Sequence, residues 1–345
     1  MPKASLSTFR KVKDLLSYKE TDLTETDLQE MYKTMLLSRR LDERMWLLNR
    51  AGKLPFVISC QGQEATQVGA AFALDKEQDI INPYYRDLAL VTHFGMTPEE
   101  TMLSAFARGA DVQSGGRQMP GHFSKKASNI MTQGSAVTTQ ILHGVGASFA
   151  MKMDGEKRIA LATLGEGSTS QGDFHEGLNF AGVHKLPFIC LIENNKYAIS
   201  VPTHLQYAAD KLSDRAIGYG MHGEQVDGND PIAVYKVMQV ARNRAINGDG
   251  ASLIEAMSSR LTPHSSDDDD KYREPEELQK NKEDDCLESF KLYLLDEKVI
   301  DEDWLTQVEA ETKETVNQAT KAAEKAPYAE AEDTMKHVYE EVNNG

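Results

Sequence analysis

The chain carries, at residues 158–202, the stretch RIALATLGEGSTSQGDFHEGLNFAGVHKLPFICLIENNKYAISVP, which decides its fold. Two short apolar runs, residues 159–164 and 187–192, each end at a turn that contains an acidic residue. Such runs are typical of buried parallel strands, and the segment between them predicts a crossover helix. Because parallel strands end at the same edge of a sheet, Glu166 and Asn195 should lie close together although they are far apart in sequence.

The turn after the first predicted strand combines two glycines with an acid. Gly165 and Gly167 would let the backbone approach a phosphate and adopt positive φ, and a helix opening near residues 168–172 would direct free N–H groups at an anion. Glu166 would repel a bare diphosphate, but it becomes useful if Mg²⁺ bridges protein and phosphate oxygens. Mg²⁺ prefers about six oxygen ligands with few carboxylates. One glutamate, one asparagine amide and one backbone carbonyl therefore suit this ion.

The stretch has two other interpretations. The first is a dinucleotide-binding fingerprint, GxGxxG, which fails here because the position three after Gly167 is Ser170. The second is a plain loop whose paired asparagines occur by chance. The glycine–acid–glycine triplet, its distance from the asparagines and the flanking strands together favour a site for a metal-bound diphosphate.

Composition narrows the class of protein. With 345 residues, 40% of them apolar, the chain can bury a large core in about two domain-sized units. No segment approaches the roughly 20 uninterrupted apolar residues of a membrane helix. Asp14, Glu20 and Asp22 argue against a transit peptide, so we expect a cytoplasmic protein. The net charge of −16 argues against nucleic acid or an anionic membrane as partner, because Lys and Arg drive such binding.

The chain divides into three predicted regions: a helical arm at residues 1–55, an α/β core at 56–273 and a helical tail at 274–345. In the arm, Thr24 and Thr26 are candidate helix caps. The apolar residues at helical spacing that follow them are Leu28, Met31, Met35, Leu36 and Leu41, and Gly52 is a candidate stop. The core ends in a further strand at residues 252–257. This order predicts a mostly parallel sheet flanked by helices.

Several blocks of the chain resemble one enzyme family. The triplet Gly165-Glu166-Gly167, followed by residues 168–193 and Asn194-Asn195, resembles the thiamine diphosphate motif. Further similar blocks, in the family's order, are FVISCQGQE at 56–64, PYYRD at 83–87, GRQMPGH at 116–122 and RLTPHSSDD at 260–268. Together they are similar to the alpha subunit of the decarboxylating component of 2-oxo acid dehydrogenase complexes, particularly the bacterial branched-chain type. The resemblance covers about residues 22–335 and implies the thiamine diphosphate-binding fold.

This resemblance implies thiamine diphosphate and Mg²⁺ as cofactors. The implied Mg²⁺ ligands are Glu166, Asn195 and the Tyr197 carbonyl. The other residues implied to contact the cofactor are Tyr85, Arg86, Ser135, Val137, Gly167, Ser168 and His264. Family members of this type can also bind K⁺, here through Gly134, Ala136, Thr139 and Gln140. Arg86 is physically suited to its role, because a guanidinium stays charged and offers a bidentate fork to phosphate oxygens.

His264 is the main candidate for proton chemistry. It lies in a Pro-His-Ser-Ser loop after a predicted strand, and its neutral-range pKa lets it donate or accept a proton. The resemblance implies a catalytic role for it, together with Arg260 and Ser265; in mitochondrial relatives the counterpart of Ser265 is phosphorylated. Two departures affect phosphate contacts without removing a metal ligand: Glu193 replaces an arginine of animal relatives, and Lys196 replaces a glycine of some relatives.

The activity that the resemblance implies is oxidative decarboxylation of branched-chain 2-oxo acids with reductive acylation of a lipoyl group. One chain of this length with a single cofactor-type core is too short to hold both halves of such a site. We therefore predict a beta subunit, an assembly of two alpha and two beta chains, and the lipoyl domain of an acyltransferase as partners. Alternatives are pyruvate or acetoin as substrate, or a noncatalytic nucleotide-binding or scaffolding protein, since a fold alone does not settle function.

Overall fold

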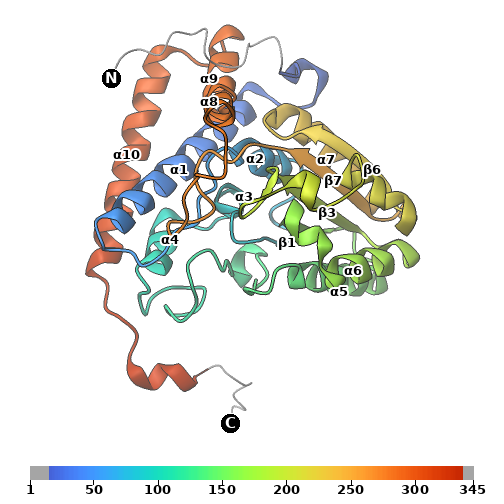
Figure 1. Cartoon of the computed structure of the whole chain (residues 1–345), viewed down its shortest axis with the longest axis horizontal. Coiled ribbons are helices and arrows are strands. Elements are labelled where there is room, and N and C mark those ends of the chain that lie inside the picture. The colour runs from blue at the N-terminus through green and yellow to red at the C-terminus, as the bar shows by residue number, and fades with distance from the viewer. Residues whose placement is uncertain (1–14, 337–345) are drawn as a thin grey trace.

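A computed structural model describes residues 15–336 of the chain. A five-stranded parallel sheet forms the centre of the molecule (Figure 1). The strand order is β1-β2-β3-β7-β6. The strands are β1 (Ile80–Asn82), β2 (Ala160–Gly165), β3 (Phe188–Asn194), β6 (His222–Asp227) and β7 (Ser252–Met257). All four pairings in this sheet are parallel. A separate antiparallel hairpin joins β4 (Tyr197–Ala198) to β5 (Val201–Pro202).

The two strands predicted from the opening stretch are β2 and β3, each shifted by about one residue. They pair in register, with Gly165 beside Glu193, so their carboxyl ends lie side by side as expected. The predicted crossover helix is α6 (Gly172–Val183), and the predicted last strand coincides with β7. The expected α/β fold with a mostly parallel sheet flanked by helices is confirmed.

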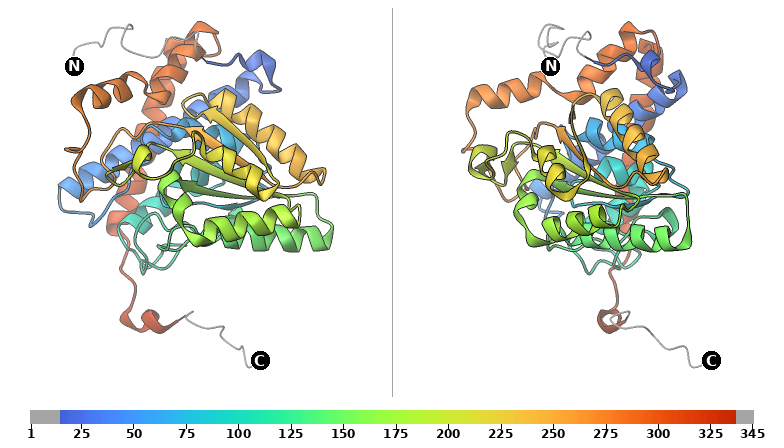
Figure 2. Two further views of the ribbon diagram at one scale, coloured as in Figure 1. Left: turned by 45° about the vertical axis from the view of Figure 1, so that its right-hand side comes forward. Right: turned by 90° about the vertical axis from the view of Figure 1, so that its right-hand side faces the viewer.

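Helices cover both faces of this sheet (Figure 2). Alternate residues of a strand point to opposite faces. Accordingly, Ala162 and Leu164 of β2 pack with α5 (Thr139–Asp154) and α6, while Leu161 joins the larger cluster that contains α2 (Glu64–Phe72) and α7 (Pro231–Ile246). Burial on both faces explains why β2 and β3 are apolar at nearly every position.

The remaining elements connect and cover this centre. The other α-helices of the middle region are α3 (Leu88–His93) and α4 (Pro98–Ala105). The short 3₁₀ helices are η3 (Tyr18–Glu20), η4 (Lys126–Ser128), η5 (Glu166–Ser170), η6 (Thr203–Leu205), η7 (Leu212–Tyr219) and η8 (Ala331–Met335). Among the described residues, no helix is long and apolar enough to cross a membrane.

The predicted arm contains one long helix, α1 (Glu25–Arg50). Thr24 is its N-cap and forms a capping box with Asp27, whereas Thr26 lies in the first turn. The chain leaves the helix through Gly52, whose φ of +72° favours glycine. All five apolar residues noted for their helical spacing are buried. The arm's first residues, 1–14, lie outside the described part of the chain.

The predicted tail is helical, with α8 (Pro275–Glu283), α9 (Cys286–Asp296) and α10 (Glu302–Lys325). Helix α10 runs beside α1 (Figure 1), and buried residues of both helices belong to one hydrophobic cluster with β2 and β3. Arm and tail thus share their core with the sheet. The division at residues 55 and 273 stays a prediction, and residues 337–345 of the tail lie outside the described range.

Candidate functional site

The carboxyl ends of β2 and β3 bring Glu166 and Asn195 together. The Asn195 backbone N–H donates to Oε2 of Glu166 at 3.3 Å, and both residues are buried. Asn195 Oδ1 accepts from the backbone N–H of Tyr197 at 3.2 Å, which ties the start of the β4–β5 hairpin to the same point. The three residues expected to bind Mg²⁺ are therefore neighbours in space.

Glu166 is an acid in an environment that disfavours its charge. Burial raises the pKa of its carboxyl, and hydrogen bonds together with the positive charge of Arg260 oppose this shift. Gln206, which sequence reasoning missed, donates from Nε2 to Glu166 Oε1 at 3.3 Å. A divalent cation at this carboxylate would favour the ionised form. Within residues 15–336 no group of three or more His, Cys, Asp or Glu could hold a metal, and the expected ligand set includes one carboxylate only.

The glycines of the turn serve a different purpose from the one expected. Neither Gly165 nor Gly167 adopts positive φ, because 166–170 form the 3₁₀ helix η5 and α6 begins only at Gly172. A Cβ at Gly167 would lie 2.4 Å from the Cβ of Ala198, so this glycine lets the β4–β5 hairpin approach. A left-handed backbone conformation occurs instead after β3, at Lys196, whose φ is +75°. This conformation explains why a glycine is favoured at that position.

Arg86 links the FVISCQGQE block to the His264 loop. Its guanidinium is buried, its Nη1 donates to the Ser59 carbonyl, and its Nη2 donates to the His264 carbonyl at 3.3 Å. Nη2 also lies 3.2 Å from Nδ1 of His264. The neighbouring Tyr85 places its ring centroid 5.4 Å from the Arg86 guanidinium carbon. The structure thus brings together three of the residues that the sequence assigned to the cofactor and to catalysis.

His264 is held as a neutral imidazole. Burial, followed by the positive charges of Arg86 and Arg260, lowers its pKa to about 4. A guanidinium can only donate hydrogen bonds, so Nδ1 must accept from Arg86 and the proton of the neutral ring resides on Nε2. The Tyr85 ring stands edge-on at 6.0 Å. His264 can therefore donate a hydrogen bond from Nε2 at neutral pH.

The two other loop residues are held by local contacts. Arg260 Nη2 donates to the Ile199 carbonyl at 2.8 Å and also bonds to the Tyr272 hydroxyl. Ser265 is buried, and its Oγ donates to Asp268 Oδ2 at 2.5 Å. These contacts order the loop without giving Ser265 a direct bond to His264.

Two buried guanidinium groups at this edge are not in direct contact with a carboxylate of the described residues. Among residues 15–336, neither Arg86 nor Arg260 forms an ion pair with a carboxylate. Arg86 Nε and the Nε and Nη1 of Arg260 also have no hydrogen-bond partner there. Burial and the nearby Arg86 lower the pKa of Arg260. Buried charges without partners are costly, so the donor set fits a polyanion such as a diphosphate.

The residues expected at the pyrimidine and K⁺ sites lie in the loop before α5 and in the first turn of this helix. Ser135 is exposed, and its Oγ lies 2.6 Å from Nε2 of His122, while Val137 is half-buried. In the described part of the chain no hydrogen bond joins either residue to Glu166, Asn195 or His264. Of the expected K⁺ ligands, Gln140 donates to the Thr163 carbonyl at 2.9 Å; the others are Gly134 and Ala136, which are exposed, and Thr139, which is half-buried.

Comparison with known proteins identifies the class to which this fold and site belong. The family described as Dehydrogenase E1 component matches residues 32–332, and the chain belongs to this family. A 2-oxoisovalerate dehydrogenase subunit alpha from Bacillus subtilis (strain 168) is 55% identical over 318 residues, which span 92% of this chain and 96% of that protein. The pyruvate dehydrogenase E1 component subunit alpha of the same organism is 38% identical over 93% of this chain and 84% of that protein. The resemblance to branched-chain alpha subunits is confirmed.

Proposed function

We propose that this chain is the alpha subunit of a branched-chain 2-oxo acid dehydrogenase. The reaction is oxidative decarboxylation of a branched-chain 2-oxo acid, coupled to reductive acylation of a lipoyl group. The observation that carries this assignment is the pair of buried, unpaired guanidinium groups of Arg86 and Arg260 beside the Glu166–Asn195 pair. Identity is higher to the 2-oxoisovalerate relative than to the pyruvate relatives, which supports the branched-chain substrate.

Membership of this family implies thiamine diphosphate, which when bound supplies the electron sink for decarboxylation. In our proposal Glu166, Asn195 and the Tyr197 carbonyl hold Mg²⁺ against the diphosphate. The diphosphate is neutralised by Arg86 beside Tyr85 and approached by Gly167 and Ser168. Ser135 and Val137 contact the pyrimidine side, and a K⁺ ion would use Gly134, Ala136, Thr139 and Gln140.

In this proposal the neutral ring of His264 donates a hydrogen bond. Arg86 fixes the ring through Nδ1, so its Nε2–H can be directed at the substrate or at a lipoyl sulfur. The loop that carries His264 is anchored by two hydrogen bonds between Ser266 and the Val57 backbone. Ser266 N–H donates to the Val57 carbonyl at 2.8 Å, and Val57 N–H donates to Ser266 Oγ at 3.0 Å. Arg260 and Ser265 keep the loop in place from its two sides.

The proposed assembly contains a beta subunit, with two alpha and two beta chains, and delivers the acyl group to the lipoyl domain of an acyltransferase. E1 alpha subunits work with a beta subunit and with the core of the complex, and both relatives named above are alpha subunits. The exposed position of Ser135 is compatible with a site completed by a second chain.

An apolar cavity beside the His264 loop supports the substrate class. Its volume is about 30 Å³. Its walls include Phe56, Val57, Tyr85, Leu88, Ser104 and Phe123. This mainly apolar lining suits an alkyl side chain of the substrate. Tyr85 and Val57 connect it to the loop, because the first faces the His264 ring and the second pairs with Ser266.

The assignment is tested by co-expressing the chain with candidate beta subunits and assaying decarboxylation with added thiamine diphosphate and Mg²⁺. We expect activity that depends on both additions and a higher kcat/KM for 2-oxoisovalerate than for pyruvate. A higher kcat/KM for pyruvate would instead indicate that the chain is the alpha subunit of a pyruvate dehydrogenase. An assembly that binds no thiamine diphosphate would refute the enzymatic proposal.

Filling the apolar cavity should change substrate preference. Ser104 lies on α4 in the cavity wall and is buried, so Ser104→Phe should occupy the space that we assign to the branched side chain. A methylene in a hydrophobic pocket is worth about 10- to 200-fold in kcat/KM. We expect the ratio of kcat/KM for 2-oxoisovalerate over pyruvate to fall at least tenfold in the phenylalanine variant and to stay unchanged in Ser104→Ala. Equal losses for both substrates would contradict this role of the cavity.

A further inference from the structure

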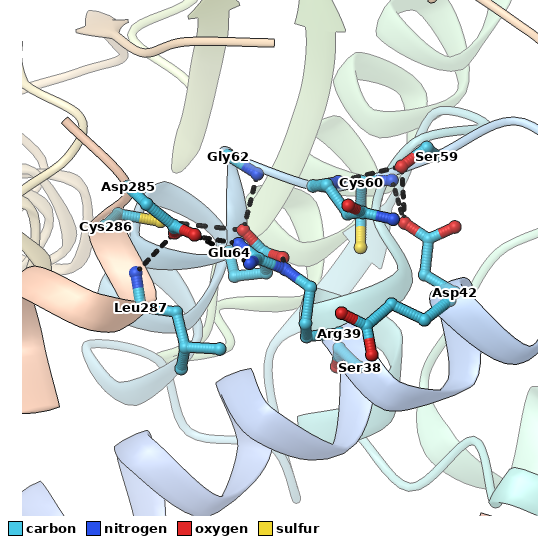
Figure 3. Close-up of polar contacts among 12 residues, drawn as sticks. Ser38, Arg39, Asp42, Ser59, Cys60, Gly62, Glu64, Asp285, Cys286 and Leu287 are labelled. Atoms are coloured by element: carbon cyan, nitrogen blue, oxygen red, sulfur yellow. Dashed lines mark hydrogen bonds and ion pairs between the residues drawn. The ribbon is translucent and has the colours of Figure 1, made fainter. Parts of the chain in front are cut away.

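Residues 59–64, which we call the bridging segment, lie between helix α1 and the candidate site. On one side they contact side chains of α1 and of the start of α9 (Figure 3). On the other side they contact Arg86, Asn195 and the His264 loop. The bridging segment therefore connects helices α1 and α9, of the predicted arm and tail, to the candidate site.

Asp42 of α1 binds the beginning of the bridging segment. Its Oδ2 accepts from Ser59 Oγ at 2.5 Å and from the Cys60 backbone N–H at 2.9 Å. Asp42, Ser59 and Cys60 are all buried, so water does not compete for these bonds. Figure 3 shows the Asp42 side chain pointing from α1 at the Ser59 hydroxyl and the Cys60 backbone.

Glu64 binds the end of the bridging segment. Its Oε2 accepts from the Gly62 backbone N–H at 2.7 Å, and its Oε1 accepts from Nε of Arg39, one turn before Asp42 on α1, at 2.6 Å. Arg39 also donates to both oxygens of Asp285, the N-cap of α9, at 2.8 and 3.0 Å. This ionic cluster joins α1, the bridging segment and α9.

The opposite side of the bridging segment faces the site. The Ser59 carbonyl accepts from Arg86 Nη1, and Gln63 Oε1 accepts from Asn195 Nδ2 at 3.4 Å. The His264 loop packs tightly here as well, because a Cβ at Gly62 would lie 2.1 Å from the Ser259 carbonyl oxygen. A shift of Ser59 would therefore move the hydrogen-bond acceptor that orients Arg86.

The Asp42 carboxyl acts mainly as a hydrogen-bond acceptor. Burial, reinforced by the negative Glu64, raises its pKa to about 7, although the bonds from Ser59 and Cys60 and the positive Arg39 oppose the shift. Its Oδ1 has no hydrogen-bond partner among the described residues. One oxygen thus makes both contacts, and the negative charge is not needed for either.

We propose that Asp42 is a positioning residue of the cofactor site: its acceptor oxygen fixes Ser59 and Cys60 so that the Ser59 carbonyl orients Arg86, and Arg86 in turn orients His264. This inference rests on the proposed role of Arg86 at the diphosphate. It gives helix α1, which holds none of the proposed cofactor ligands, an influence on cofactor binding through Ser59 and Arg86.

The test compares two substitutions of Asp42 in the assembled alpha and beta protein. Asp42→Leu keeps the branching at Cγ but removes both acceptors, and we expect its Kd for thiamine diphosphate with Mg²⁺, measured by calorimetry, to rise at least tenfold. Asp42→Asn keeps one acceptor oxygen and should stay within about threefold of the unmodified protein. Should Asp42→Leu fail to assemble, Ser59→Ala, which removes one of the two bonds, should raise the Kd at least threefold.

A matched control separates positioning from general stability. Leu28→Ala opens a cavity at a fully buried position of α1, about 21 Å along the helix from Asp42. We expect it to lower Tm but to leave the Kd unchanged. The inference is overturned if Asp42→Leu binds normally, if Asp42→Asn loses as much affinity as Asp42→Leu, or if Leu28→Ala weakens binding equally. A wild-type assembly that does not bind thiamine diphosphate would instead refute the proposed function.

Discussion

Replacing Glu166 by glutamine should weaken Mg²⁺-dependent binding of thiamine diphosphate at least hundredfold. In our proposal the carboxylate is the only charged protein ligand of the ion, and an amide oxygen is a much weaker partner for Mg²⁺. Calorimetric titration of the assembled protein with thiamine diphosphate, with and without Mg²⁺, measures the change. The unmodified protein should show a large difference between the two titrations, and the variant almost none.

The fold should survive this substitution. Burial raises the pKa of Glu166, so the folded protein without cofactor disfavours the ionised form, and its contribution to stability falls as pH rises through the folded pKa. A neutral glutamine removes that penalty, and Tm without cofactor should not fall at pH 7. Glu176→Gln, the same change at an exposed position of α6, serves as control and should bind normally. Unchanged affinity in the Glu166 variant would exclude the proposed metal site.

Replacing His264 by alanine should leave cofactor binding intact but reduce acylation of a lipoyl domain at least hundredfold. In our proposal the neutral ring of His264 donates a hydrogen bond from Nε2, and removing one such preorganised donor costs about 10² to 10³ in kcat. Acylation of a purified lipoyl domain is the measurement, with the Kd for thiamine diphosphate determined alongside. His204→Ala, at an exposed histidine, should affect neither. Normal acylation by the His264 variant would remove this residue from the mechanism.

The protonation state of His264 can be tested by a pH titration. Because burial and the two arginines lower that pKa to about 4, the imidazole stays neutral above that pH in the assembly without cofactor. NMR titration should therefore show no change of His264 between pH 6 and 8. Addition of thiamine diphosphate and Mg²⁺ places negative charge beside Arg86 and should move the pKa upward. A titration near 6.5 before any addition would contradict the buried, arginine-bound environment.

The strands and the acid–amide pair could be predicted because they depend on local pattern. Uninterrupted apolar runs indicate strands buried on both faces, and parallel strands necessarily end at one edge, so the meeting of Glu166 with Asn195 followed from topology alone. The backbone of the turn could not be predicted in the same way. Gly167 is required by the approach of Ala198, and left-handed conformations occur instead after β3, at Lys196 and Ile199.

The sequence by itself determined the fold class, the strands that carry the site and the residue types able to hold a metal-bound diphosphate. Only the tertiary structure decided which distant side chains support them: Gln206 at Glu166, Arg86 against His264, and Asp42 behind Ser59. The physical reason is that periodicity and turn chemistry act over a few neighbouring residues. A hydrogen bond between buried groups far apart in the chain exists only once packing has brought them within about 3 Å of one another.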